Sequence, residues 1–393
     1  MDLGAAAFED AGARRCLSPE EDGAERKSGR VVLFFSRPSP EHESSNATIM
    51  DIGIDSFAAI LPDPVTGKLP SATERMAELL EEVEVAEMAG LDVFGIGEHH
   101  RAEFLDSAPA IILAAAAART SRIRLTSAVT VISAADPVRV FQEFATLDLI
   151  SKGRAELVVG RGSFGEAFPL FGLDPRAYDD LFAEKLDLLL QLGETTHLNW
   201  EGRFRPALKG EGVYPRPHQR RLPVWVGVGG TPASFARAGA MGLPLMIAII
   251  GGSFDRFRPL VDLYREAGAR AGHRPEELRV GIHAMGFVSD TDIAARDAFY
   301  PGWSHLTAKI GRERGWSPPS REQFDFMAGP EGAFLVGGPE HVAAKMLQAS
   351  EVLGGVFFIT FQMSTASLET EAMKRSIRLL GTVVAPIVRT AMQ

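Results

Sequence analysis

The feature of the sequence that most constrains the fold is a repeated alternation of short apolar runs with longer segments of helical periodicity. Apolar runs typical of strands lie at residues 51–57, 91–97, 124–132, 154–160, 224–228, 245–250, 280–288 and 355–361. Helical patterns lie at residues 72–89, 109–120, 137–150, 178–192, 232–241, 254–271, 293–310, 339–350 and 368–390. This alternation indicates parallel βα units, and eight such strands predict a (β/α)8 TIM barrel.

The 393 residues are compatible with one such domain, because α/β barrels with insertions exceed about 400 residues. Two irregular stretches, 196–222 and 315–338, are too long for ordinary connections, so we expect insertions that roof or flank the site. An open doubly wound sheet shows the same alternation, but its glycine-rich phosphate loop usually follows the first strand. Here the best glycine-rich loop follows the fifth strand, which favours the barrel.

Residues 1–49 differ from the rest of the chain. They mix Gly, Ala, Ser and Pro with many charged side chains, and only 31–35 is strand-like. We expect a disordered N-terminal extension, followed by one barrel domain at 50–393. Met50 immediately precedes the first strand pattern and is a candidate start of the native protein. Detection of residues 1–49 by intact-mass measurement of native protein would contradict this hypothesis.

Composition excludes several classes of function. The net charge of −10 disfavours nucleic acid, because phosphate backbones are bound mainly by clustered Lys and Arg. Cys16 is the only cysteine, so an internal disulfide and a cysteine-ligated metal site are excluded. No apolar stretch is long enough to span a membrane, and the first 30 residues lack the pattern of a secretory signal. We therefore expect a cytoplasmic protein without a membrane partner.

The first candidate group is Glu98-His99-His100, at the C-terminal end of the second predicted strand. Barrel active sites lie at this end of the strands. Adjacent residues of an extended strand point to opposite faces, so at most one of these histidines readily faces the site. A histidine satisfied by local hydrogen bonds explains the pattern equally well. A metal site is disfavoured, because no further cluster of His or Cys has ligand spacing.

The second group is Arg161 with Ser163, after the fourth predicted strand. Arg161 lies between Gly160 and Gly162, where the backbone can approach a ligand closely. A guanidinium makes charge-assisted and often bidentate contacts with phosphate, and Ser163 would add a hydroxyl donor. The alternative is a structural ion pair between Arg161 and a nearby carboxylate, that of Glu156 or Glu166.

The third group is the loop 227–232 (GVGGTP), which runs from the fifth predicted strand into a helix. Thr231 is a natural N-cap and Pro232 suits the first helical position, so unpaired backbone N–H groups favour an anion there. Gly229, Gly230 and Ser234 belong to the same candidate cradle. Because both glycine-rich loops leave one end of the barrel, we expect them to bind a single phosphate together.

With these residues identified, the chain resembles bacterial luciferase and its flavin-dependent relatives. The likeness rests on EHHRAEF at 98–104, DPVR at 136–139, LDLISKGR at 147–154, RG at 161–162 followed by Phe168 and FG at 171–172, PVWV at 223–226 and GLP at 242–244. It covers the chain from Met50 onward, and the run from 136 to 172 is highly specific.

The resemblance implies a barrel that binds reduced FMN and uses dioxygen to oxygenate a small organic substrate. By position, His99 resembles the catalytic histidine of the family. The peptide between Ala128 and Val129 matches a non-proline cis linkage that lies against the flavin ring. The phosphate-contacting positions of the family fall on Arg161, Ser163, Gly229, Gly230, Thr231 and Ser234. Neighbouring helices form the family's dimer interface, so with the small residues at 114–118 we expect a homodimer.

The chain also departs from luciferase. Gly160 stands where luciferase has a reactive cysteine, and Gly230 replaces a carboxylate of its phosphate loop, so light emission is not expected. No second dinucleotide motif is visible, and we expect a separate reductase to supply the reduced flavin. Two other functions stay open: a deazaflavin-dependent hydride transfer, and a flavin-binding partner without catalysis. The substrate is not legible, although Phe57, Phe104, Phe164, Phe168 and Trp225 are candidates for an apolar pocket or for ordinary core.

Overall fold

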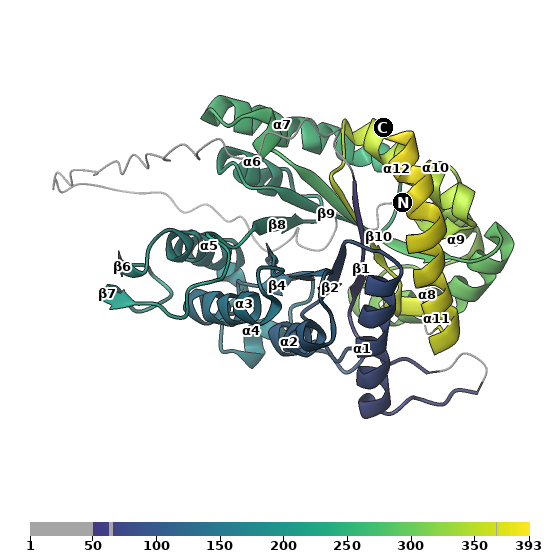
Figure 1. Cartoon of the computed structure of the whole chain (residues 1–393), viewed down its shortest axis with the longest axis horizontal. Coiled ribbons are helices and arrows are strands. Elements are labelled where there is room, and N and C mark those ends of the chain that lie inside the picture. Colours follow the sequence, from purple (N-terminus) through teal and green to yellow (C-terminus); the bar gives the residue numbers. More distant parts are fainter. Residues whose placement is uncertain (1–49, 63–65, 367) are drawn as a thin grey trace.

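The computed structural model describes residues 50–62, 66–366 and 368–393 (Figure 1). The expectations for residues 1–49 lie outside this range. Within the described ranges, no helix is both long enough and apolar enough to cross a membrane.

The core of the fold is a closed parallel barrel, as predicted. Its strands are β1 (Asp51–Ser56), β2 (Val93–Ile96), β3 (Arg124–Ser127), β4 (Thr130–Val131), β5 (Leu157–Gly160), β8 (Val224–Val228), β9 (Leu245–Ile249), β10 (Val280–Val288) and β12 (Phe358–Gln362). They are hydrogen bonded in the order β3-β2-β1-β12-β10-β9-β8-β5-β4. A parallel bridge between Leu125 and Ala155 joins β3 to β5, so β3 and β4 are two pieces of one barrel strand and the ring closes.

Helices cover the outside of this barrel (Figure 1). They are α1 (Ala72–Met88), α2 (Pro109–Arg119), α3 (Pro137–Ser151), α4 (Ala167–Leu170), α5 (Tyr178–Glu194), α6 (Pro232–Ala240), α7 (Arg258–Ala271), α8 (Asp292–Arg314), α9 (Arg321–Ala328), α10 (Pro339–Leu353), α11 (Thr370–Leu379) and α12 (Ala385–Ala391). The local sequence determines where several of these helices begin. Ser71 and Glu74 form a capping box at α1, and Asp136 caps α3 while Pro137 occupies its first turn.

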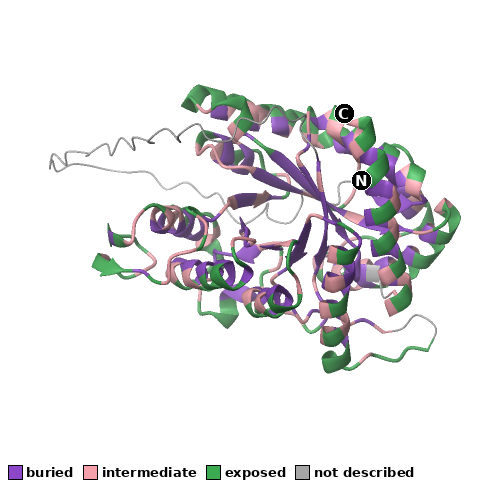
Figure 2. Ribbon diagram, in the orientation of Figure 1, coloured by how far each residue is buried: buried purple, intermediate pink, exposed green. Residues whose placement is uncertain are grey.

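Alternation along the strands divides the apolar side chains between two cores. On β8, Val226 and Val228 point outward into the large cluster between the sheet and the helices. Trp225 points inward and packs with Val158, Met246 and other residues in a small cluster inside the barrel. Figure 2 shows the result: the barrel strands are buried, and the outer surfaces of the helices are exposed. Barrel strands with both faces covered explain the continuous apolar runs of the sequence.

The structure differs from the predicted elements mainly in the two long insertions. Residues 196–222 contain a hairpin of β6 (His197–Trp200) and β7 (Leu208–Gly212), and 315–338 contains α9 and β11 (Leu335–Gly337). β6 and β7 are mostly exposed, and β11 has three residues, so neither leaves a long apolar pattern. The predicted helix 368–390 is interrupted by a π-helical turn at Leu380–Val384.

The insertions flank the barrel at different places. The β6–β7 hairpin lies beside α5, and Arg205 in it pairs with Asp136 at the start of α3. In the second insertion, β11 adds a parallel strand to the end of β10. Phe324 of α9 and Phe334 pack with Phe299 of α8 in a separate apolar cluster. We therefore find both insertions beside the barrel.

Candidate active site

The three groups predicted from the sequence lie at one end of the barrel. His99 follows β2, Arg161 follows β5, and Thr231 follows β8. All three strands are parallel, so their C-terminal ends open at the same mouth. Side chains at this mouth that face inward, including Ala128, Val129 and Met285, are partly exposed, whereas the apolar layer beneath them is buried.

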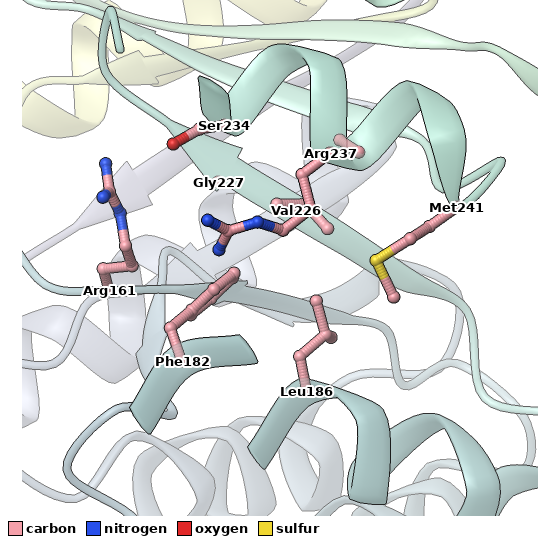
Figure 3. Close-up of a pocket in the computed structure, with 9 residues that line it drawn as sticks. Arg161, Phe182, Leu186, Val226, Gly227, Ser234, Arg237 and Met241 are labelled. Carbon is pink, nitrogen blue, oxygen red and sulfur yellow. The ribbon is translucent and has the colours of Figure 1, made fainter. Parts of the chain in front are cut away.

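Arg161 and the loop after β8 meet at a pocket (Figure 3). Nη2 of Arg161 lies 3.4 Å from Oγ1 of Thr231 and donates a hydrogen bond to it. The pocket is lined by Arg161, Phe182, Leu186, Val226, Gly227, Ser234, Arg237, Ala238 and Met241. Its floor is apolar, and its polar groups are two guanidinium groups and one hydroxyl. The convergence expected for Arg161, Thr231 and Ser234 is therefore present.

Two polar atoms of this pocket lack partners. Among the described residues, Oγ of Ser234 and Nη1 of Arg237 are buried and make no hydrogen bond. Figure 3 shows the Ser234 hydroxyl on the side of Arg161, and the Arg237 guanidinium extending back toward Arg161. A buried polar atom without a partner is uncommon and calls for an explanation, such as an absent ligand or water. No carboxylate lines this pocket.

Arg237 is the charged residue of this pocket that was not predicted from the sequence. It lies on α6, three positions after Ser234, so both side chains lie on the same face of the helix. This i, i+3 spacing was available in the sequence and would have been a usable signal. Gly229 and Gly230 precede the helix, and a Cβ built on either would meet no atom within 4 Å. Their loop thus leaves open space beside the start of α6.

Arg161 forms an ion pair with Asp179, and not with Glu156 or Glu166. Its Nη1 donates to Oδ1 of Asp179 at 2.6 Å, and its guanidinium lies 4.8 Å from the centre of the Tyr178 ring. The Asp179 side chain is 62% exposed, so this pair is a surface interaction of modest strength. Glu156 and Glu166 instead pair with Arg124 and Arg101.

Thr231 and Ser163 were both predicted to contact the phosphate, and the structure places them differently. Thr231 is the N-cap residue of α6, with Pro232 in its first turn, but its side chain makes no capping hydrogen bond. Its Oγ1 accepts from Arg161 instead. Ser163 does not line the pocket with Arg161, and its carbonyl accepts a hydrogen bond from Nη2 of Arg314 at 2.7 Å. The loop after β5 is thereby tied to the end of α8.

His99 is held by a buried carboxylate. Nδ1 of His99 lies 2.8 Å from Oδ2 of Asp106, and its backbone N–H donates to Oδ1 at 3.1 Å. Asp106 is completely buried, and burial raises the pKa of its carboxyl even though the hydrogen bond from His99 lowers it. Gly97 makes room for this pair, because a Cβ there would lie 2.6 Å from Asp106 Oδ2. The histidine is therefore held in one orientation.

The two histidines have separate environments, although both lie beyond the end of β2, where strand alternation no longer applies. His100 contacts Oε1 of Glu98 through Nε2 at 3.2 Å, and this hydrogen bond raises the pKa of His100. Oε2 of Glu98 accepts from the backbone N–H of Val131 at 2.8 Å, which joins the β2 loop to β4. His100 therefore belongs to a structural contact, whereas His99 faces the aromatic residues described next.

Three phenylalanines surround His99. The ring centres of Phe57, Phe104 and Phe164 lie 4.4, 4.7 and 5.4 Å from that of His99. Two other aromatic candidates are core residues. Trp225 packs against Phe358 inside the barrel, and Phe168 is buried next to Tyr178.

The peptide bond between Ala128 and Val129 is cis, in agreement with the expectation from the resemblance. Val129 points into the barrel, where a Cβ at Gly160 would lie 2.6 Å from Val129 Cγ2. A Cβ at Gly227 would lie 2.7 Å from Val129 Cγ1. These two positions are therefore glycine because Val129 occupies the space beside them. No group of three or more His, Cys, Asp or Glu side chains in the described part of the chain is arranged for a metal ion.

Comparison with known proteins agrees with this arrangement. The sequence model of the luciferase-like monooxygenase family matches residues 50–355. The 4-hydroxyprotoasukamycin monooxygenase of Streptomyces nodosus subsp. asukaensis is 27% identical over 330 residues, covering 78% of this chain and 86% of its own length. Two uncharacterized proteins of Sinorhizobium fredii match over 44% and 98% of their own lengths.

Solved structures share the same barrel. The monooxygenase RslO1 from Streptomyces bottropensis superposes with a TM-score of 0.74 at 26% identity, over 86% of this chain and 99% of its own. The oxygenating constituent of 3,6-diketocamphane monooxygenase from Pseudomonas putida, in complex with FMN, gives 0.69 at 20% identity, over 86% and 98%. An F420-dependent secondary alcohol dehydrogenase gives 0.66 at 18% identity, over 86% and 99%.

The last two likenesses show the fold alone, and between them they include an FMN protein and a deazaflavin protein. The family match spans most of the barrel, including the His99 loop, the cis peptide and both glycine-rich loops. The chain belongs to the luciferase-like monooxygenase family.

Proposed function

We propose that this protein is an FMN-dependent monooxygenase that binds the cofactor phosphate between Arg161 and the start of α6. The observation that carries the proposal is the pair of buried polar atoms without partners, Ser234 Oγ and Arg237 Nη1, in the pocket that Arg161 lines. A phosphoryl group would accept hydrogen bonds from both. Charge-assisted bonds of this kind are among the stronger ones in proteins.

The surroundings of the pocket suit a dianion. Two guanidinium groups and the N-terminus of α6 supply positive charge, and phosphate groups bind readily at helix N-termini. The open space at Gly229 and Gly230 admits an oxygen close to the backbone. Among the residues that the structure describes, Asp179 is the carboxylate bonded to Arg161, and its exposed side chain can be replaced by phosphate at small cost.

His99 is the proposed catalytic residue. Reduced flavin supplies the electrons that activate dioxygen when it is bound. Asp106 accepts from Nδ1 of His99, so the neutral imidazole has Nε2 as its acceptor, ready to hold or move a proton. The rings of Phe57, Phe104 and Phe164 pack around the imidazole of His99, which is 8% exposed. We propose that Ala128 and Val129 contact the flavin ring.

The proposal also covers the source of the reduced flavin and the oligomeric state of the protein. We infer that a separate reductase delivers reduced FMN in the cytoplasm, and that the substrate is a small organic compound. We also propose a homodimer that associates through the helices near 109–120. Ile111 of α2 and Leu149 and Ile150 of α3 are large apolar residues with exposed side chains, which suits an interface.

The experiment compares FMN with riboflavin, which lacks the phosphate. Titration of the full chain should give a dissociation constant about 10- to 100-fold lower for FMN, from 1.5 to 3 kcal/mol of charged hydrogen bonds. Equal affinities would contradict the phosphate assignment. Mixing the reduced FMN complex with oxygenated buffer should give reoxidation kinetics that differ from those of free reduced FMN.

A deazaflavin-dependent hydride transfer is the second candidate, favoured by the fold shared with the F420-dependent dehydrogenase. The titration separates the two, because coenzyme F420 carries a long anionic tail beyond its first phosphate. Tighter binding of F420 than of FMN would favour the second candidate. Consumption of NADH by the pure protein with FMN, at a high rate, would contradict the separate reductase.

A further inference from the structure

A second histidine lies inside the barrel on the wall formed by β10, β12 and β1. His283 of β10 points inward, and its Nδ1 lies 2.6 Å from Oδ2 of Asp55 on β1. Thr360 of β12, between them, donates its hydroxyl to the same carboxylate oxygen. Asp55 is 2% exposed and Thr360 is 1% exposed. The function proposed above makes no use of this group.

One atom of the group has no protein partner. Among the described residues, Oδ1 of Asp55 is buried and makes no hydrogen bond. It lies over Gly95, where a Cβ would come within 2.0 Å of it and 3.1 Å of the Ala128 side chain. The carboxylate therefore lies next to the peptide that we propose contacts the flavin ring.

The orientation of His283 leaves one nitrogen available. Because Nδ1 faces a carboxylate, it is the donor in the neutral ring, and Nε2 is the acceptor. Within the described ranges Nε2 makes no hydrogen bond, and 9% of the side chain is exposed. The ring stacks on Phe57 at 5.8 Å between centres, with 18° between the planes. Phe57 also contacts His99, so its ring connects the two histidines.

We propose that Nε2 of His283 binds the hydroxyl of an aromatic substrate, so that the enzyme oxygenates phenols. An acceptor nitrogen beside an aromatic ring selects a ligand that combines an O–H donor with a flat apolar ring. Overall, a phenol, dioxygen and reduced flavin would give a dihydric phenol, water and oxidised flavin: one oxygen atom enters a ring C–H bond, and the other leaves as water with the two electrons supplied by the flavin. As the substrate reacts, its O–H bond breaks and the proton binds Nε2, and this proton returns to the same oxygen when the ring C–H proton is lost. The resulting imidazolium is stabilised by the Asp55 carboxylate, which acts as a positioning residue. This inference rests on the proposed function for its reaction.

The first test uses the wild-type full chain without cofactor. The probes are 4-nitrophenol and 4-nitroanisole, which have the same ring, but the second has a methyl ether in place of the hydroxyl. We expect the phenol to bind at least about 10-fold more tightly, the effect of one charge-supported hydrogen bond. Equal binding, or tighter binding of the ether, would overturn the proposal without any variant being made.

The second test assigns the preference to residues. His283→Leu should abolish the preference for the hydroxyl while the affinity for 4-nitroanisole stays within about twofold. Asp55→Asn should reduce the fraction of bound probe that is ionised, which the visible absorption of nitrophenolate reports. His305→Asn changes an exposed histidine of α8 and should leave both readouts unchanged. A hydroxyl preference that persists in His283→Leu would overturn the assignment.

These outcomes can be told apart from failure of the proposed function. If FMN binds the wild type better than riboflavin but the phenol shows no preference over the ether, the present inference alone is wrong. If the phenol preference is present while FMN and riboflavin bind equally, the phosphate assignment alone is wrong.

Discussion

The two ends of the barrel use buried polar side chains in different ways. At the N-terminal end, Arg124 pairs with Asp51 at 2.6 Å and with Glu156 at 2.7 Å, and its guanidinium covers the ring of Phe358. At the C-terminal end, Ser234, Arg237 and Asp55 each keep a buried polar atom without a partner.

We infer that the ion pairs at the N-terminal end serve stability, whereas the polar atoms at the C-terminal end serve ligand binding. At the N-terminal end the charges are paired within the chain, although Nε of Arg124, 2.7 Å from Glu156, makes no hydrogen bond of good geometry among the described residues. Removing one partner would leave an uncompensated charge. Unpartnered atoms at the C-terminal end cost free energy in the protein without a ligand, and a ligand recovers that cost when it binds. Barrel enzymes place their active sites at this second end, and the comparison can be tested by substitution at each end.

The largest effect on stability is expected from Arg124→Met. It leaves Glu156 buried without its cation, and burial already raises the pKa of that carboxyl. We expect a loss of about 3 kcal/mol in the free energy of unfolding at neutral pH, measured by urea denaturation. The loss should shrink at acid pH, where Glu156 is protonated in both states.

The matched control for this change is Arg119→Met, which removes a surface pair with Glu84 and should change stability by less than about 1 kcal/mol. Affinity for FMN should be unaffected by Arg124→Met. A loss of FMN affinity comparable to that of a variant at the mouth would contradict the separation of the two ends.

Arg161→Ala is expected to have the next largest effect, which is on the affinity for FMN and not on stability. Loss of a charged hydrogen bond to phosphate should raise the dissociation constant for FMN by about 10- to 100-fold, or 1.5 to 3 kcal/mol. Riboflavin affinity should not change. Arg176→Ala, at a side chain that is 89% exposed, is the control. If Arg161→Ala bound FMN as tightly as the wild type, the assignment of the phosphate site to Arg161 would be wrong.

Glu103 is a carboxylate near the mouth that, unlike Asp55, is paired with cationic side chains, those of Arg101 and Lys309. Burial raises its pKa, but hydrogen bonds from Lys309 and Arg101 outweigh this and hold the pKa at about 2. Solvent screens the pair with the exposed Lys309, so the contribution of Glu103 to stability is roughly 2 kcal/mol. This contribution is present above its unfolded pKa near 4.5 and is lost as pH falls toward 2.

Glu103→Gln should therefore lower the unfolding free energy at pH 6 and flatten its fall between pH 4.5 and 2. Urea denaturation at several pH values measures both effects. Glu322→Gln, at an exposed position of α9, should alter the profile by less than about 0.5 kcal/mol. An equal effect of the two substitutions would show that Glu103 contributes no more than a surface carboxylate.

Ser234→Ala should have the smallest effect, and it should change protein stability and FMN affinity in different directions. Removing a hydroxyl without a partner should leave stability unchanged or raise it by up to about 1 kcal/mol. FMN affinity should fall about fivefold, the effect of one hydrogen bond. Thermal unfolding and titration measure the two quantities. A clear loss of stability would mean that the hydroxyl serves the fold.

Much of this arrangement could be predicted from the sequence. The apolar runs gave the barrel strands, and Thr231-Pro232 gave the start of α6. The pairing of Arg161 with Asp179 could not be predicted, because they lie 18 positions apart in the chain on either side of the short helix α4. Arg237 was missed although its spacing from Ser234 placed it on the same helix face.

The sequence predicted a parallel sheet with helices on both faces from its alternation of apolar runs and helical patterns. The glycine-rich loop after the fifth strand then favoured a barrel over an open sheet. The sequence also determined which loops reach the barrel mouth, because parallel strands all end there. Which side chains meet across that mouth depends on how the strands close into the barrel and cannot be read from the sequence. Asp55, His283 and Thr360 lie on three strands far apart in the chain, and it is barrel closure that brings their polar atoms within hydrogen-bonding distance.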